Sequence, residues 1–109
     1  MAVWACLFHD TEKMLAARRE RRADHHAFLD RHREMILLAG ALLGEDESQP
    51  SAALWIVEAD SREAVETLIG QDPYFQSGHR SCRILEWKLA RERYGEHLRE
   101  LLAFATDTT

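Results

Sequence analysis

Residues 3–8 read Val-Trp-Ala-Cys-Leu-Phe, and this stretch decides how the rest of the chain is interpreted. It is short, apolar on both faces and rich in residues that favour β-structure, which is typical of a buried strand. The polar residues His9, Asp10 and Thr11 follow it and lead the chain out of the sheet. We therefore expect residues 3–8 to form a central strand.

Helical spacing begins soon after this strand. Residues 12–32 predict one helix, in which Phe28, Leu29 and His32 recur at intervals of three and four. No apolar stripe runs through residues 18–24, so we expect the start of this helix to be exposed or to face a cleft.

Three later segments predict the remaining strands. Residues 35–43 form an apolar run that ends in a charged loop with Pro50, and residues 53–59 and 79–87 supply the third and last strands. Between the last two strands, residues 64–69 present one apolar face and predict a short helix.

The ends of this second helix carry their own signals. Asp60 and Glu63 have the spacing of a capping box, and Gly70 ends the helix. Asp72 precedes Pro73, which biases its backbone away from the α region. One role open to Asp72 is therefore to cap the turn that Pro73 begins.

The predicted order is strand, helix, strand, strand, helix, strand. This βαββαβ order is that of the ferredoxin-like α+β fold, in which both helices cover one face of an antiparallel sheet. The other face, to which we assign Trp55 and Trp87, would then stay uncovered. Because a large exposed apolar surface usually implies association, we expect a homodimer packed sheet to sheet.

The 109 residues suit one compact domain. We assign residues 1–90 to the ferredoxin-like domain and residues 91–109 to a helical extension of it. This amphipathic extension is expected to pack on its own domain or across the dimer, and its apolar stripe consists of Tyr94, Leu98, Leu101, Leu102 and Ala105.

Composition argues against several partners. The formal net charge is −5, whereas a nucleic-acid groove would need a basic surface, and no apolar segment approaches the ~18 residues that span a bilayer. Cys6 and Cys82 form no CxxC pair, and no basic residue precedes the opening apolar run as in a signal peptide. We expect a reducing, cytoplasmic compartment, with contact between the two thiols favoured over a disulfide.

Five segments together resemble the YCII-related family, and the resemblance runs from Val3 to about Trp87. They are residues 22–29, 38–43, 56–61 leading into Glu63-Ala64, 71–75 followed by Gly78, and 86–87. The chain departs from the family pattern at Ala23 and Ala41, where prolines are usual, and at His26, where leucine is usual. Ala41 loosens a turn near the implied pocket, so a relative's substrate does not transfer directly.

The resemblance implies a dimeric α/β barrel with His25 and Asp72 in one pocket. His25 would be the general acid or base, and Asp72 would fix its tautomer and stabilise the imidazolium. Tyr74, in the same segment as Asp72, becomes a candidate for the pocket wall and for substrate binding. One branch of the family is linked to elimination from chlorinated hydroxy-aromatic compounds.

Helix spacing independently adds two arginines to His25. Positions 18, 22 and 25 differ by four and three, so Arg18 and Arg22 would share a helix face with the histidine. Two guanidiniums beside an imidazole suit a carboxylate, phenolate or enolate, and they would stabilise a developing oxyanion.

No metal or cofactor site is expected. Of the six histidines, His25 and His32 share a face but stand roughly 10 Å apart along a helix, too far for one ion. The chain has no glycine-rich phosphate loop, no GxSxG elbow and no HExxH motif.

These features predict a small-molecule enzyme, lyase-like or isomerase-like, that uses His25 and Asp72 for cofactor-independent proton transfer. The reaction would be elimination, isomerisation or hydrolysis of a small anionic or aromatic compound. Two alternatives stay open: a non-catalytic dimeric module that binds a metabolite, and a structural dimer whose C-terminal helix recruits a partner protein. In the simplest alternative, His25 is an ordinary polar surface residue.

Overall fold

A computed structural model describes residues 2–107 of the chain, with side chains for residues 2–100. The elements in chain order are β1 (Ala2–Asp10), α1 (Met14–Glu20), α2 (Arg22–Arg31), β2 (Ile36–Leu42), β3 (Ala52–Ala59), α3 (Arg62–Gly70), α4 (Pro73–Gln76), β4 (Arg80–Glu86) and α5 (Arg93–Asp107).

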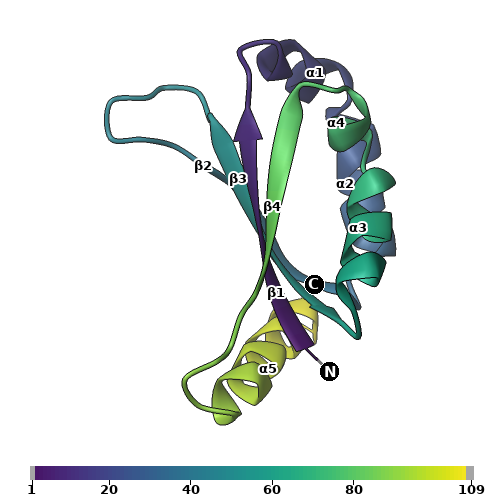
Figure 1. Cartoon of the computed structure of the whole chain (residues 1–109), viewed down its shortest axis with the longest axis vertical. Coiled ribbons are helices and arrows are strands. Elements are labelled where there is room, and N and C mark those ends of the chain that lie inside the picture. Colours follow the sequence, from purple (N-terminus) through teal and green to yellow (C-terminus); the bar gives the residue numbers. More distant parts are fainter. Residues whose placement is uncertain (1, 108–109) are drawn as a thin grey trace.

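The four strands form one antiparallel sheet in the order β2-β3-β1-β4. Strand β1 lies between β3 and β4, so the predicted central strand is confirmed. Helices α1 to α4 cover one face of the sheet, and α5 lies on the opposite side at one end (Figure 1). With α1 and α2 in the first helical position and α3 and α4 in the second, the arrangement is the ferredoxin-like α+β fold.

The main core lies between the sheet and the helices. Alternate residues of β1, namely Trp4, Cys6 and Phe8, are buried on this side. The register pairs Cys6 with Trp55, which places Trp55 on the same face. Its ring packs on Phe8 and Phe28, with centroids 4.8 and 5.9 Å apart.

The assignment of Trp55 to the uncovered face was therefore wrong, because Trp55 is only 1% exposed. An apolar strand carries no polar alternation that would show which of its faces meets the helices. Trp87, by contrast, is 48% exposed just beyond β4.

The single helix predicted over residues 12–32 was also wrong. The helix breaks at Arg21, whose backbone has φ −113° and ψ 11°. Arg21 Nη1 donates to the carbonyl oxygen of Pro73 at 3.1 Å and ties the break to α4. The charged run around Arg21 has no apolar periodicity, so nothing in the pattern marked this interruption.

The start of α3 differs from prediction by one residue. Ser61, not Asp60, is the N-cap: its backbone is extended, and its Oγ accepts a hydrogen bond from the Ala64 amide at 3.1 Å. Ser, Thr, Asp and Asn all suit this position, so two adjacent candidates cannot be separated by residue type alone.

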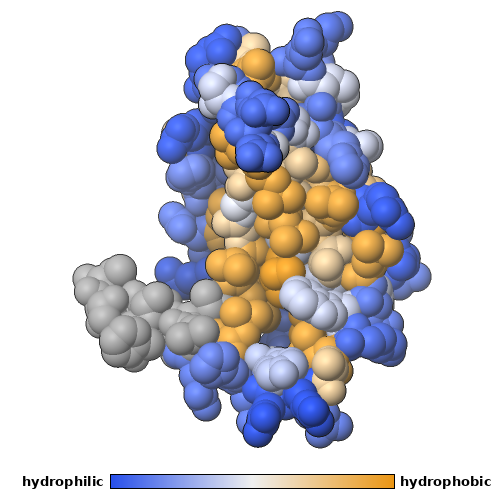
Figure 2. Space-filling view, turned by 90° about the vertical axis from the view of Figure 1, so that its left-hand side faces the viewer, coloured by the Kyte–Doolittle hydropathy of each residue, from blue (hydrophilic) through white to orange (hydrophobic). Residues whose placement is uncertain are grey.

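The outer face of the sheet is apolar and only partly covered. Helix α5 shields one end, where Val3, Ile56 and Glu58 are buried and Arg99 pairs with Glu58. The rest stays open, and Figure 2 shows an apolar patch in its centre. Leu38, which pairs with Ile56 and so shares its face, is 54% exposed.

Helix α5 only partly matches its predicted stripe. Leu98 and Tyr94 both line a cavity between α5 and the outer face, but Tyr94 remains 48% exposed. The side chains of Leu101, Leu102 and Ala105 lie outside the described residues. Across residues 2–107, no helix is both long enough and apolar enough to cross a bilayer.

Candidate active site

A cavity of about 430 Å³ lies between the first two helices and the sheet. It is also bounded by the middle of β2 and by the end of the loop before β3. The side chains that matter for its chemistry are Arg18, Arg22, His25, Tyr74 and Arg80. The cavity therefore joins groups from α1, α2, α4 and β4.

His25 lines this cavity and contacts Asp72, which does not line it. His25 lies in the first half of α2, and Asp72 is the N-cap of α4. Their Nδ1 and Oδ1 atoms are 2.7 Å apart. His25 is 8% exposed, and Asp72 is 0% exposed. His25 is thus not an ordinary surface residue.

Asp72 performs two local tasks with one oxygen. Its backbone is extended, with φ −73° and ψ 123°, as expected for the residue before a proline. Its Oδ1 accepts a hydrogen bond from the Tyr74 amide at 3.2 Å and also contacts His25. The capping role is confirmed, and it coexists with the contact to the histidine. The short helix α4 itself was missed by sequence reasoning.

The contact with Asp72 also orders the two nitrogens of His25. A carboxylate can only accept a hydrogen bond, so Nδ1 is the donor in this pair. Nε2 is then the nitrogen that can take up or release a proton. Asp72 Oδ2 is buried and has no hydrogen-bond partner within residues 2–100.

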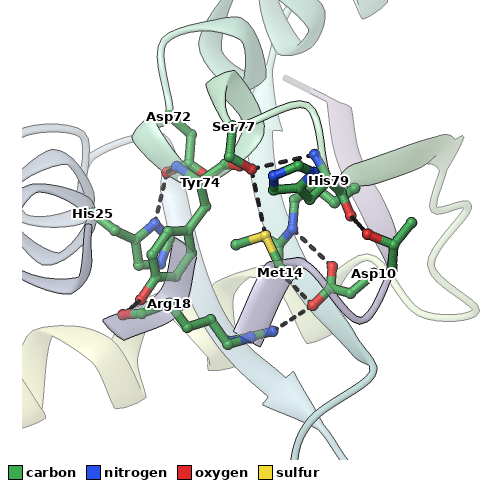
Figure 3. A network of polar contacts seen from close by, with 10 residues as sticks. Asp10, Met14, Arg18, His25, Asp72, Tyr74, Ser77 and His79 are labelled. Carbon is green, nitrogen blue, oxygen red and sulfur yellow. Dashed lines mark hydrogen bonds and ion pairs between the residues drawn. The ribbon is translucent and has the colours of Figure 1, made fainter. Parts of the chain in front are cut away.

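Tyr74 supports the histidine from the side. The two rings stack with centroids 3.8 Å apart and an interplanar angle of 10°. Figure 3 shows them side by side, together with the contact from His25 to Asp72. The Tyr74 hydroxyl donates to the Arg18 carbonyl oxygen at 3.1 Å. Burial raises the pKa of Tyr74, which keeps the phenol protonated as this donor.

Arg18 and Arg22 line the same cavity as His25, although they lie on different helices. Arg18 Nη2 contacts Asp10 Oδ2 at 2.8 Å (Figure 3). Arg22 is exposed. The predicted convergence of three side chains therefore holds in space, even though the continuous helix assumed for it does not exist.

Sequence reasoning missed Arg80 and Asp10. Arg80 lines the cavity, and its Nε and Nη2 contact the two oxygens of Asp10 at 2.9 and 3.1 Å. The two residues are direct partners in the β1–β4 register. Opposite charges at the ends of two predicted strands indicate a contact between them only once the register of the strands is known.

The described part of the chain contains no group of three or more His, Cys, Asp or Glu side chains that could hold a metal ion. Cys6 and Cys82 are free thiols. A hydrogen bond with Cys82 and burial both raise the pKa of Cys6, which disfavours the reactive thiolate.

The family model of the YCII-related domain matches residues 2–88. The chain belongs to the YCII family. No curated protein matches it. As a YCII protein it shares its fold with the 5-chloro-2-hydroxyhydroquinone dehydrochlorinase TftG of Burkholderia phenoliruptrix AC1100, whose structure contains 2,5-dihydroxybenzoquinone. The TM-score is 0.70 at 23% identity, over 79% of this chain and 93% of that one.

A second similar structure is the cofactor-independent oxygenase SnoaB of Streptomyces nogalater. The TM-score is 0.49 at 10% identity, over 83% of this chain and 93% of that one. At 23% identity the likeness to the dehydrochlorinase concerns the fold. The residues of the candidate site are therefore argued from the YCII protein's own geometry.

Proposed function

We propose that this YCII protein is a small-molecule enzyme in which His25 transfers a proton without a cofactor. The observation that carries the proposal is the 2.7 Å contact between the fully buried Asp72 and His25, which lines a cavity of about 430 Å³. A histidine held in one tautomer, with its other nitrogen free, is the usual form of a general base.

The reaction would begin with a compound bound beside Nε2. His25 takes a proton from it, and the Asp72 carboxylate stabilises the imidazolium that forms. Negative charge then develops on an oxygen of the compound, where a cationic wall stabilises it. Return of the proton to another carbon or oxygen of the compound gives isomerisation, and departure of a leaving group with its bonding electrons gives elimination. In hydrolysis His25 would instead take the proton from a water molecule that attacks the compound, and would return it to the leaving group whose bond breaks.

The choice of compounds to test follows from the arginines that line the cavity and from the fold. Arg18, Arg22 and Arg80 favour an anion. The dehydrochlorinase with the same fold acts on a chlorinated hydroxyhydroquinone. Small carboxylates and hydroxy-aromatic compounds are therefore the candidates for the substrate of this protein.

The experiment has two stages. A ligand that binds the native state raises the melting temperature, so a thermal-shift screen identifies compounds that bind. Each hit is then incubated in D₂O, and NMR follows deuterium incorporation and product formation. We expect both to fall by about 10²–10⁴-fold in His25→Ala, the usual contribution of a general base.

His26→Ala is the matched control. His26 also lines the cavity but is exposed, with its ring centroid 5.8 Å from that of His25. We expect this variant to retain most of the rate. If the hits bind equally well to the wild type and His25→Ala and none reacts, the enzyme proposal is wrong. That result would instead support a metabolite-binding module.

We also propose a homodimer formed through the open part of the outer sheet face. Leu7, Leu54 and Leu38 lie on that face by strand register, and the apolar patch is centred there. Exposed patches of this kind commonly mark association sites.

A further inference from the structure

The charges around the candidate site are unevenly distributed. Among the described residues that line the cavity, three are arginines and two are histidines, whereas none is Asp or Glu. The one carboxylate bound to Arg18 and Arg80, that of Asp10, is not among the residues that line the cavity. A molecule in the cavity therefore meets the cations and not their counter-ion.

Asp10 also fixes how each guanidinium is used. It engages Nε and Nη2 of Arg80 and Nη2 of Arg18. Arg80 Nη1 has no hydrogen-bond partner among the described residues, yet it is not one of their fully buried partnerless atoms. The Arg80 side chain is only 1% exposed, and because Arg80 lines the cavity we assign this remaining donor to the small part of the guanidinium that reaches it.

Arg18 is also incompletely satisfied. Its Nε is buried and has no hydrogen-bond partner within residues 2–100. Buried polar groups without partners are uncommon, and an absent water or ligand is a frequent reason for them. Arg18 and Arg80 both have unused donors, and one carboxylate holds them together.

Aromatic contacts fix the distance between this cationic pair and the histidine. The guanidinium carbons of Arg18 and Arg80 lie 5.7 and 5.6 Å from the centroid of the Tyr74 ring. The same ring stacks on His25 at 3.8 Å. Tyr74 therefore fixes the position of the two guanidiniums relative to the His25 imidazole.

We propose that Arg80 is a substrate-binding residue and that Asp10 is its positioning residue. Together with Arg18, Arg80 binds the carboxylate group of a small carboxylic acid whose body extends toward His25. A carboxylate has two oxygens and can accept from both guanidiniums at once, whereas a phenolate has one. This inference names the substrate class of the proposed enzyme and rests on that proposal, but it concerns binding alone.

Benzoate and benzamide are the probes, because they share size and shape and differ in charge. Dissociation constants are measured by NMR titration at neutral pH and low salt, first for the wild type. We expect benzoate to bind at least about tenfold more tightly than benzamide, as hydrogen bonds to charged groups imply. Equal binding of the two probes would overturn the inference.

Arg80→Met should abolish this preference while leaving benzamide affinity unchanged. Arg83→Met is the matched control: Arg83 lies three residues along β4, pairs with Leu7 on the outer face and is exposed. Arg83→Met should keep the wild-type preference. If Arg80→Met keeps it as well, Arg80 does not bind the carboxylate.

Three further variants guard against misfolding and test the roles of Asp10 and Arg80. In Asp10→Leu/Arg18→Met/Arg80→Leu all three members of the buried network are removed together, an exchange that folded proteins often tolerate, and the preference should again be lost. Asp10→Asn keeps both arginines but loosens them. It should weaken benzoate binding more than benzamide binding, and Arg80→Lys should restore only part of the preference because Lys lacks the planar fork.

Failure of this inference can be distinguished from failure of the proposed function. If His25→Ala stops deuterium incorporation while Arg80→Met binds benzoate like the wild type, the carboxylate inference falls and the enzyme proposal stands. If the benzoate preference depends on Arg80 but no hit reacts, the carboxylate site stands as a binding site and the proton-transfer proposal falls.

Discussion

At the scale of single residues, the site depends on side chains that contact one another before any ligand arrives. His25 is held by Asp72 at one nitrogen and by the Tyr74 ring on one face. Tyr74 is itself fixed by its hydroxyl, which donates to the Arg18 backbone. In the proposed proton transfer, such preorganisation would lower the cost of reaching the reactive geometry.

Tyr74→Phe tests the anchoring hydroxyl while keeping the stacked ring. Losing this one hydrogen bond should lower the free energy of unfolding by about 1 kcal/mol at neutral pH. Tyr94→Phe makes the same change at an exposed ring and should have little effect. Urea denaturation of both variants measures the difference, and equal losses would contradict the role given to the hydroxyl.

The same pair of variants carries a pH prediction. Because burial raises the pKa of Tyr74 in the folded state, the unfolded chain ionises first, near pH 10. The contribution of the protonated Tyr74 hydroxyl to the free energy of unfolding is therefore complete below about pH 10. It is lost as the pH rises through the pKa of Tyr74 in the folded state. Wild type and Tyr94→Phe should lose stability over this range, and Tyr74→Phe should lose less.

At the scale of elements, the apolar runs were enough to predict four strands, two helical regions and their order. They were not enough to orient Trp55 or to bring Asp10 to Arg80, because both depend on strand register. The break at Arg21 escaped prediction because its neighbours are charged. The pairing of His25 with Asp72 came from family resemblance, since the two residues are 47 positions apart.

The N-caps of α3 and α4 provide an element-scale test. Ser61→Ala removes a cap alone and should cost about 1 kcal/mol of the free energy of unfolding. Asp72→Ala removes a cap and also leaves His25 Nδ1 without its partner, so its cost should be larger, about 2–3 kcal/mol. Chemical denaturation compares the two, and a smaller cost for Asp72→Ala would contradict the double role.

At the scale of the whole molecule, the sheet has two different faces. Four helices cover one face, and α5 shields only one end of the other (Figure 1). The open remainder is apolar (Figure 2). This asymmetry concentrates the proposed site on the helical side and leaves the outer side available for a second copy of the chain.

Leu38→Arg tests the proposed dimer. A charge at the centre of an apolar interface is costly, so this variant should shift sedimentation equilibrium toward the monomer at micromolar concentration. Thr67→Arg adds the same charge at an exposed position of α3, on the helical side, and should sediment like the wild type. An unchanged mass for Leu38→Arg would argue against association through this face.

The double use of Asp72 Oδ1 also links local order to chemistry. Helix α4 is a single turn, and short turns of this kind open and close far more often than a whole domain unfolds. Each opening that releases the Tyr74 amide also frees the oxygen that orients His25. The fraction of molecules ready to react would therefore follow the fraction in which this turn is closed. Replacement of Asp72 by an apolar residue would therefore remove the cap of α4 and the orientation of His25 in one step.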